Sequence, residues 1–268
     1  MSSSSVSEAA GLALEPLHYI LLMVVGLVSG VINTIAGGGS FLSLPVLIFL
    51  GMPPVVANGT NRVAILLQCI AATVGFRRHG ALDLRALTWA AVPATLGAVL
   101  GTLAALWISD GAFQRVLAVL MVVVTLWTLW SGDRAGGGEE PGSEAAPRRA
   151  LHVGWLAAGF FVVGVYGGFV QAGVGFLVLA VTTLAGLDLV RGNAVKMLAV
   201  LCFTVVSLAL FAWGGKILWA PGLVHGIGSV AGALIGVRLT VLKGHAWLQR
   251  VVTVTIVVFA VKLFWDAL

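Results

Sequence analysis

Runs of about twenty apolar residues follow one another along this chain, and they constrain its fold more than any other feature of the sequence. A run of that length, folded as an α-helix, crosses the roughly 30 Å hydrocarbon layer of a bilayer. Only 9% of the residues are charged, whereas globular domains carry about a quarter. The sequence therefore predicts an all-α, polytopic membrane protein with the lipid bilayer as its surroundings, and it excludes a soluble globular fold.

The formal net charge of +5 does not indicate a nucleic-acid partner. Lys and Arg are scattered at the ends of the apolar runs and form no basic stripe along a soluble face. In such positions they orient a protein in the bilayer, because Lys and Arg collect in cytoplasmic loops. The two cysteines, Cys69 and Cys202, lie inside apolar segments without metal-ligand spacing, and we expect them to pack there.

Hydropathy and helix-breaking residues divide the chain into about ten segments, five in each half. We expect a disordered tail at 1–16, a first membrane repeat at 17–130, a cytoplasmic linker rich in Gly, Pro and charge at 131–152, and a second membrane repeat at 153–268. The segments are expected at 17–36, 40–50, 54–76, 86–108, 112–130, 153–170, 174–187, 190–213, 217–238 and 247–266.

The two halves resemble each other when one is shifted by about 134 residues. The shift aligns Gly39 with Gly173 and Arg62 with Lys196. Small residues also recur every fourth position in both halves, a spacing that lets two helix backbones pack closely. The chain therefore looks like a duplication.

Basic loops occupy different positions in the two halves. Residues 76–85 follow the third segment, whereas residues 238–250 follow the fourth segment of the second half. If both loops are cytoplasmic, equivalent loops face opposite sides and both chain ends lie outside. This plan is an inverted repeat, typical of secondary transporters. The short segments at 40–50 and 174–187 fit either a full crossing or one arm of a broken hairpin.

Each half interrupts an apolar run with glycines. The first break is Gly37, Gly38 and Gly39 followed by Ser40, and the second spans residues 167–175. Bare backbone inside a membrane is tolerated only where protein or a water-filled cavity covers it. A helix that begins after such a break presents N–H groups and the positive end of its dipole, which suit an oxyanion. The alternative is that the glycines only allow close helix packing.

Two cations, Arg62 and Lys196, lie six to eight residues inside apolar segments. A charge at the bilayer centre costs about 2.5 to 3.5 kcal/mol even on the lenient insertion scale. We expect one or both to face a cavity and attract an anion, Arg as a fork for two oxygens and Lys as a compact charge. The alternative is that both lie shallower and reach the headgroups by snorkelling.

The duplicated motifs resemble the sulfite exporter TauE/SafE family of bacterial transporters. The likeness is carried by residues 30–40 with Pro45, by 57–62, by 164–175 and by 191–196. It implies movement of sulfite or a small organosulfonate across the bacterial inner membrane, in the outward direction. The chain departs from the family pattern at Asn193-Ala194-Val195, and this leaves the identity of the substrate open.

We expect the substrate site to combine the two breaks with the polar residues beside the two cations. Asn58 equally fits a cap at the start of its helix, and Gln68 is left out because it lies on another helical face from Arg62. His225 is a candidate for proton coupling, or else a neutral histidine bonded to the backbone. The expected substrate-binding residues are Asn33, Gly37, Gly38, Gly39, Ser40, Asn58, Thr60, Asn61, Arg62, Tyr166, Gln171, Gly173, Gly175, Asn193 and Lys196.

The leading hypothesis is a secondary transporter that exports a small sulfur-containing anion by alternating access. The alternatives are an anion channel, or a carrier for another small oxyanion or carboxylate. An enzyme is not expected, since the sequence has no His-Glu-x-x-His or Gly-x-Ser-x-Gly motif, and we expect no catalytic residue, metal or cofactor. The expected partners are the small anion and the bilayer, and a homodimer is compatible with the sequence.

Overall fold

The computed structural model describes residues 14–82, 87–119, 123 and 153–266, and these residues form helices joined by short turns, with no strand among them. The expected tail up to residue 13 and the linker at 131–152 lie outside the described residues. The elements are α2 (Pro16–Ile35), α3 (Ser40–Phe49), α4 (Pro54–Arg78), η1 (Leu87–Ala91), α5 (Val92–Trp107), a helical stretch at 110–119, α7 (Val153–Phe169), α8 (Val174–Leu184), α9 (Leu189–Trp213) and α10 (Trp219–Asp266).

Five of these helical stretches are long and apolar enough to cross a membrane, while α3, α7 and α8 are shorter apolar helices. This confirms the all-α, polytopic membrane fold. Of the expected segment at 112–130, only residues up to 119 and residue 123 are described, and they are helical. The five stretches are Pro16–Ile35, Pro54–Arg78, Trp89–Trp107, Val190–Trp213 and Trp219–Leu242.

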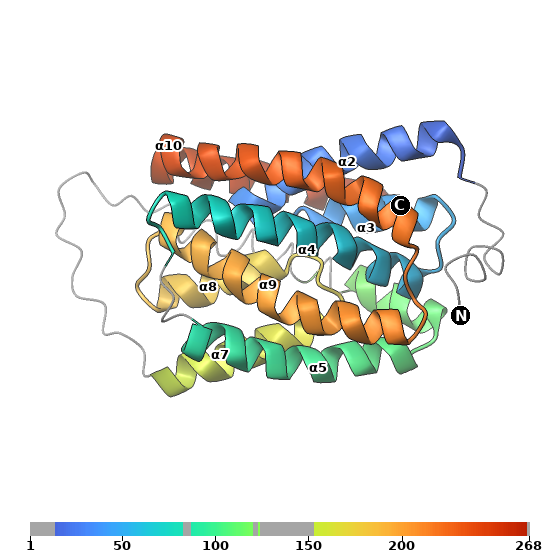
Figure 1. Ribbon diagram of the computed structural model, residues 1–268, viewed down its shortest axis with the longest axis horizontal. Helices are drawn as coiled ribbons and strands as arrows, with labels where there is room; N and C mark the ends of the chain where they lie inside the picture. Colours follow the sequence, from blue (N-terminus) through green and yellow to red (C-terminus); the bar gives the residue numbers. More distant parts are fainter. Residues whose placement is uncertain (1–13, 83–86, 120–122, 124–152, 267–268) are drawn as a thin grey trace.

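The short helices α3 and α8 are arms of hairpins. In Figure 1, α2 begins at the end of the bundle where the chain starts, and α3 returns to that end to join α4. In the same view α7 begins at the opposite end of the bundle, and α8 returns there to join α9. Of the two options that the sequence left open for these segments, the structure has the hairpin.

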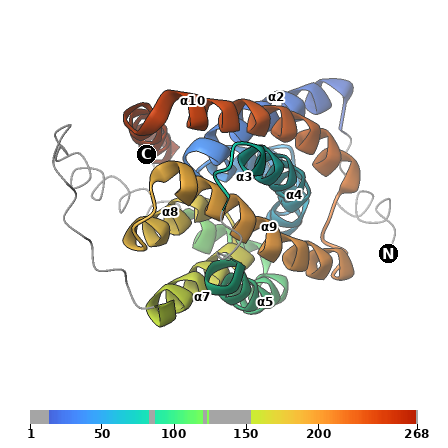
Figure 2. The same ribbon diagram turned by 60° about the vertical axis from the view of Figure 1, so that its left-hand side comes forward.

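Helices from opposite halves pack in close pairs. Figures 1 and 2 show α2 beside α10, and α5 beside α7. A Cβ atom added to Gly228 would lie 2.0 Å from the carbonyl oxygen of Met23, and one added to Gly101 would lie 1.9 Å from that of Val165. The glycine spacing seen in the sequence thus brings backbones together across both pairs.

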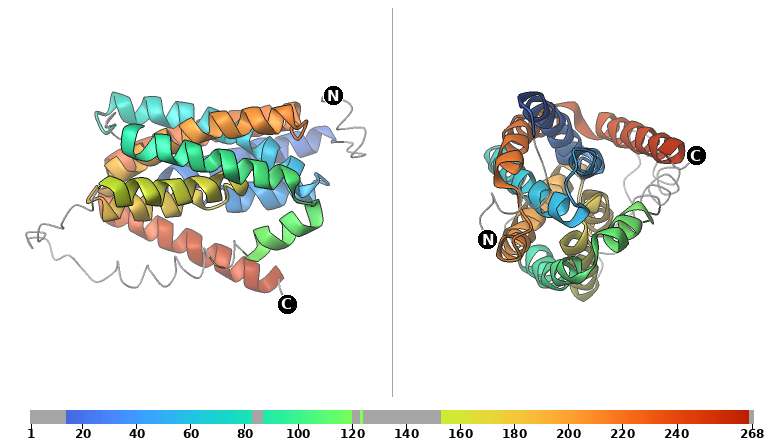
Figure 3. Two further views of the ribbon diagram at one scale, coloured as in Figure 1. Left: turned by 90° about the horizontal axis from the view of Figure 1, so that it is seen from below. Right: turned by 90° about the vertical axis from the view of Figure 1, so that its right-hand side faces the viewer.

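The expected loop at 238–250 is wrong. The helix α10 runs through it for 48 residues without a non-helical residue. A straight helix of that length would be about 70 Å long at 1.5 Å per residue. Figure 3 shows instead that the ribbon changes direction and that its last part runs back along the bundle. The stretch contains no proline and is rich in good helix formers, so its charges were mistaken for a helix end.

Candidate functional site

The two glycine breaks touch each other inside the bundle. Gly37 follows α2, and Gly175 lies in the first turn of α8. A Cβ atom on Gly37 would lie 2.4 Å from Cα of Gly175, and one on Gly175 would lie 2.3 Å from Cα of Gly37. No side chain fits at either position. The site is therefore built around a contact between two interrupted helices, one from each half.

Phenyl rings cover the next glycine on each side of this contact. The ring of Phe176 lies 2.6 Å from the Cβ position of Gly38, and the ring of Phe41 lies 2.3 Å from that of Gly173. The two rings are stacked with their centroids 6.2 Å apart. The structure thus puts Gly38 and Gly173 under rings, while Ser40, at the start of α3, is buried and faces the cavity described below.

The second break contains an unusual backbone conformation. Gln171 has φ +62°, and in the described part of the chain it is the one residue other than glycine with a positive φ. Its counterpart under the 134-residue shift is Gly37, with φ +93°. The left-handed backbone conformation costs a residue with a side chain about 1 to 2 kcal/mol of conformational free energy. Gln171 is buried, and its Nε2 donates a hydrogen bond of 2.7 Å to Oγ1 of Thr204.

The two expected cations are fully buried. Arg62 on α4 has 0% of its surface exposed, and Lys196 on α9 has 1%. A snorkelling side chain would reach the outside of the protein, so this alternative is wrong for both residues. Each cation instead donates to backbone carbonyl groups within the bundle.

The cations make the same contact twice, each across the boundary between the halves. Nη2 of Arg62 donates to the carbonyl oxygens of Gly167 at 3.1 Å and Gly168 at 2.5 Å, near the end of α7. Nζ of Lys196 donates to those of Asn33 at 2.9 Å and Thr34 at 3.1 Å, near the end of α2.

The donors and the acceptors in these two contacts are related by the same 134-residue shift. The last carbonyl groups of a helix lack intrahelical partners and form its negative end. Arg62 and Lys196 therefore stabilise the broken ends of α7 and α2, a role that the sequence did not reveal.

The environments of the two cations differ in their remaining donors. Lys196 also donates to Oδ1 of Asn193 at 2.5 Å, so three acceptors surround its ammonium group. In the described part of the chain, Nε and Nη1 of Arg62 have no hydrogen-bond partner, and the ring of Phe211 lies 4.8 Å from its Cζ. Arg62 thus keeps two nitrogen atoms, with three N–H groups between them, for a further acceptor.

Other buried N–H donors on the helices of the two cations also lack a hydrogen-bond partner. Among the described residues, unpartnered amide N–H groups outnumber unpartnered amide oxygens around the two breaks. A buried polar group without a partner is costly, so this interior favours a ligand that accepts hydrogen bonds. The donor atoms are Nδ2 of Asn61, Nε2 of Gln68 and Nδ2 of Asn193, and the acceptor atoms are Oδ1 of Asn58 and Oε1 of Gln171.

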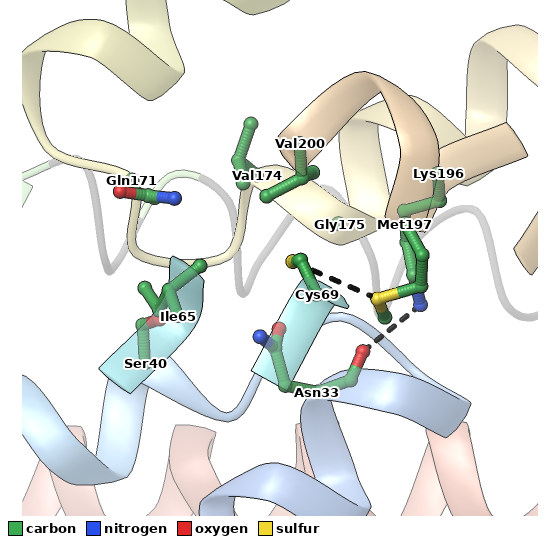
Figure 4. Close-up of a pocket in the computed structure, with 10 residues that line it drawn as sticks. All are labelled: Asn33, Ser40, Ile65, Cys69, Gln171, Val174, Gly175, Lys196, Met197 and Val200. Carbon is green, nitrogen blue, oxygen red and sulfur yellow. Dashed lines mark hydrogen bonds between the residues drawn. The ribbon is translucent and has the colours of Figure 1, made fainter. Parts of the chain in front are cut away.

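A small cavity lies between the second break and Lys196. Figure 4 shows Asn33, Ser40, Gln171 and Lys196 around it, from α2, α3, the second break and α9. The space open to the centre of a water molecule is about 10 Å³, enough for about one water. A larger ligand requires the helices to move apart.

Two sulfur atoms complete the wall of this cavity. Sγ of Cys69 lies 3.9 Å from Sδ of Met197, and both residues line the cavity. The sequence indicated only packing for Cys69. Its position opposite Lys196 depends on how α4 and α9 face each other, which no spacing along one helix reveals.

The remaining expected residues brace the break. Nδ2 of Asn58 donates to the carbonyl of Phe169 at 2.8 Å, and the hydroxyl of Tyr166 donates to that of Ala172 at 2.5 Å. Oγ1 of Thr60 accepts from N–H of Leu218 at 3.0 Å. These three side chains do not line the cavity.

The alternative role of Asn58 as a helix cap is wrong, because Asp110 does this for α4. The carboxylate oxygen Oδ1 of Asp110 accepts from N–H of Val55 at 2.9 Å. Asn58 lies inside the helix, one turn past its start.

A second, narrower cavity, without room for a water molecule in this closed structure, adjoins the first and shares Asn33, Ser40 and Ile65 with it. Asn61, Gln68 and His225 line this second cavity. Gln68, which the sequence left out because it lies on another helical face from Arg62, lines this second cavity and not the cavity of Lys196.

The sequence is similar to a known family and to known membrane proteins. The family model described as "Sulfite exporter TauE/SafE" matches residues 22–263. A "probable membrane transporter protein" of Haemophilus influenzae is 31% identical over 92% of this chain and 94% of its own length. The "probable membrane transporter protein YfcA" of Escherichia coli K12 is 29% identical over 94% of this chain and 92% of its own. No solved structure matches significantly.

Proposed function

Because the chain belongs to the sulfite exporter TauE/SafE family, we propose that it exports a small sulfur oxyanion, sulfite or an organosulfonate, across the bacterial inner membrane. The relatives named above carry the word transporter in their names, and the family description names sulfite. In this proposal the anion binds where the two breaks meet, between the side chains of Arg62 and Lys196.

One observation carries the proposal. Arg62 and Lys196 are buried, and among the described residues no Asp or Glu is buried with them. Two like charges in a low-dielectric interior repel each other and are favoured only when opposite charge or strong hydrogen bonds compensate them. Helix carbonyls supply part of this compensation. An anion supplies the rest, and the unpartnered N–H groups of Arg62 suit its oxygen atoms.

The mechanism that we propose is alternating access between two inverted repeats. Three features support it: hairpins that enter from opposite ends of the bundle, cation contacts that recur under one shift, and a cavity at their junction. A cavity with room for about one water favours a carrier, which closes around its substrate, over an open anion channel.

Counterflow in proteoliposomes tests this function. Purified full-length protein is reconstituted with a high internal concentration of sulfite, and the uptake of trace labelled sulfite is followed. Sulfoacetate, sulfate and acetate are compared as internal anions. We expect saturable counterflow with sulfite or sulfoacetate. Flux that never saturates and shows no counterflow would support a channel instead.

Matched charge variants complete the experiment. The double variant Arg62→Gln/Lys196→Gln removes the two buried charges, whereas Arg77→Gln/Arg191→Gln removes exposed charges from the same two helices. Hydrogen bonds to charged groups are worth about 1.5 to 3 kcal/mol, so we expect sulfite affinity to fall at least tenfold in the first variant and to stay within about twofold in the second. Equal affinities in both would contradict the proposal.

A further inference from the structure

We propose that His225 is a proton site coupled to the anion site, so that one proton binds to its Nε2 atom when the anion binds and crosses the membrane with it. The inference rests on the proposed function and identifies the ion that is transported together with the anion. It follows from the position of the histidine, its bonded ring nitrogen, and the two adjoining cavities.

His225 lies on α10 with 1% of its surface exposed. Its Nδ1 atom is 3.0 Å from the carbonyl oxygen of Leu22 on α2. A carbonyl oxygen only accepts hydrogen bonds, so Nδ1 carries the hydrogen in the neutral ring. The lone pair of the neutral ring is then on Nε2, and a proton that binds there forms an imidazolium without breaking the bond to Leu22.

The cavity of His225 is lined mainly by hydroxyl and amide groups. Ser29, Ser229 and Gln68 belong to its wall, and Asn33, Ser40 and Ile65 line both this cavity and the cavity of Lys196. Gln68 is 2% exposed, and its Nε2 atom has no partner among the described residues. The side chains of Asn33 and Ser40 thus give a short polar connection from the histidine to the anion site, beside the apolar side chain of Ile65.

No other titratable group lines the cavity of His225 in the described part of the chain. The elements around it carry such groups elsewhere, while α3 carries none. They are His18 and Tyr19 on α2, Arg62, Cys69, Arg77 and Arg78 on α4, and Arg191, Lys196 and Cys202 on α9. Arg238 lies more than three turns further along α10. Histidine has an unperturbed pKa closest to neutral pH, so His225 is the group of this cavity that is suited to bind and release a proton.

The charges of the site couple the proton to the anion. An imidazolium near Arg62 and Lys196 adds a third buried positive charge, which is unfavourable in an empty site. A bound anion offsets that charge, and the proton in turn strengthens anion binding by the same factor, because such coupling is reciprocal. A doubly charged anion that leaves with one proton still carries one negative charge outward along a potential that is negative inside.

A histidine pair separates this role from a structural one. The variant His225→Asn keeps a side-chain N–H for the carbonyl of Leu22 but cannot bind a proton near neutral pH. His79→Asn is the matched control, because Nδ1 of His79 lies 2.8 Å from the carbonyl of Gly75 in an exposed position. Both variants are reconstituted with sulfoacetate, whose acid groups stay ionised near neutral pH.

Two fluxes are then compared in each protein. Counterflow at equal pH measures exchange, and accumulation driven by a pH gradient, with a trapped pH dye, measures proton coupling. We expect His225→Asn to bind sulfoacetate more weakly, to retain saturable counterflow and to lose accumulation, while His79→Asn keeps both fluxes at the wild-type level. Accumulation by His225→Asn at the wild-type level would overturn the coupling role. Absence of counterflow in the wild type would overturn the proposed function instead.

A measurement on the wild type covers the case that His225→Asn does not fold. Calorimetric titration of sulfoacetate in buffers of different ionisation enthalpy gives the number of protons taken up per bound anion. We expect about one proton near neutral pH. An uptake of zero with saturable binding would refute the proton site while leaving anion transport in place.

Discussion

The two breaks of this protein reach one geometry with different residues. In the first half Gly37 takes the left-handed conformation, and in the second half Gln171 takes it in the equivalent position. Each break ends beside a buried cation from the opposite half. The comparison teaches that the backbone path is the shared property of the halves, while the side chains have diverged.

The cations show the same divergence. Both bind the last carbonyl groups of a helix from the other half. Three acceptors surround Lys196, which lines the cavity, while Arg62 keeps two nitrogen atoms whose N–H groups have no partner. In our account Arg62 supplies the spare donors for the anion oxygens, and Lys196 supplies charge at the cavity wall. The following predictions test how unequal the halves are.

The largest effect is expected where the two breaks touch. Gly37→Ala adds a methyl group that would lie 2.4 Å from Cα of Gly175 and also forces a side chain into φ +93°. Because backbone cannot move aside cheaply, we expect counterflow to fall more than tenfold. The control is Gly186→Ala, which has φ +80° but nothing within 4 Å of the new methyl group. It should lose only the conformational cost of about 1 to 2 kcal/mol, read as a lower Tm. Equal losses of counterflow in both variants would mean that strain, and not the contact, explains the effect.

Exchanging Arg for Lys, or Lys for Arg, shows which of the two cations contributes more to sulfite affinity. Arg62→Lys keeps the charge but removes the spare N–H groups, and we expect sulfite to bind about tenfold more weakly, since a hydrogen bond to a charged group is worth about 1.5 to 3 kcal/mol. Lys196→Arg keeps the charge and its contacts with the end of α2, and affinity should change less than threefold. Titration by thermal shift measures both. The reverse ranking would assign the spare donors to the wrong half.

The aspartates that cap α4 and α9 lie outside the site, and they allow the stability of the two halves to be compared. The helix α4 is capped by Asp110, the first residue of the helical stretch at 110–119, and α9 is capped by Asp188, whose Oδ1 accepts from N–H of Val190 and Arg191 at 2.9 Å. Replacing either aspartate with alanine should lower stability by about 1 kcal/mol, with unchanged sulfite affinity. Thermal unfolding in detergent gives the first value and ligand titration the second. A changed affinity in either variant would show that these ends take part in binding.

The smallest effect is expected from making the breaks alike. Gln171→Gly removes the side chain from φ +62°, and the relief of about 1 to 2 kcal/mol is partly offset by the greater freedom of glycine when unfolded. The net gain is about 0.5 kcal/mol, seen as a slightly higher Tm. The same variant should transport more slowly, because the amide that lines the cavity is lost. A Tm that falls would indicate that the bond to Thr204 outweighs the strain.

The sequence predicted the helices well because the length of each apolar run and the positions of the glycine breaks can be read directly from the sequence. The boundaries of α2, α3, α8 and α9 agree with the expected segments to within about three residues. The continuity of α10 through residues 238–250 was missed because a charged stretch without proline can stay helical. Charge alone therefore does not end a helix.

The site was predicted only in part. The touching breaks and the burial of Arg62 and Lys196 follow from the duplication and from the cost of a charge in a membrane. That each cation binds the helix end of the other half depends on contacts between residues more than 100 positions apart, which no motif shows. The same holds for Cys69 and Gln68, whose positions are set by the packing of α4.

Anomalous diffraction from crystals soaked with selenite shows directly whether the anion binds where the two breaks meet. Selenite resembles sulfite, and the anomalous signal of selenium marks its position. The protein is prepared with ordinary methionine and with Cys69 and Cys202 replaced by alanine, since thiols react with selenite. The account predicts one selenium peak per chain where the breaks meet, within hydrogen-bond distance of Arg62 or Lys196. A peak only at the aqueous ends of the helices, with saturable binding in solution, would contradict it.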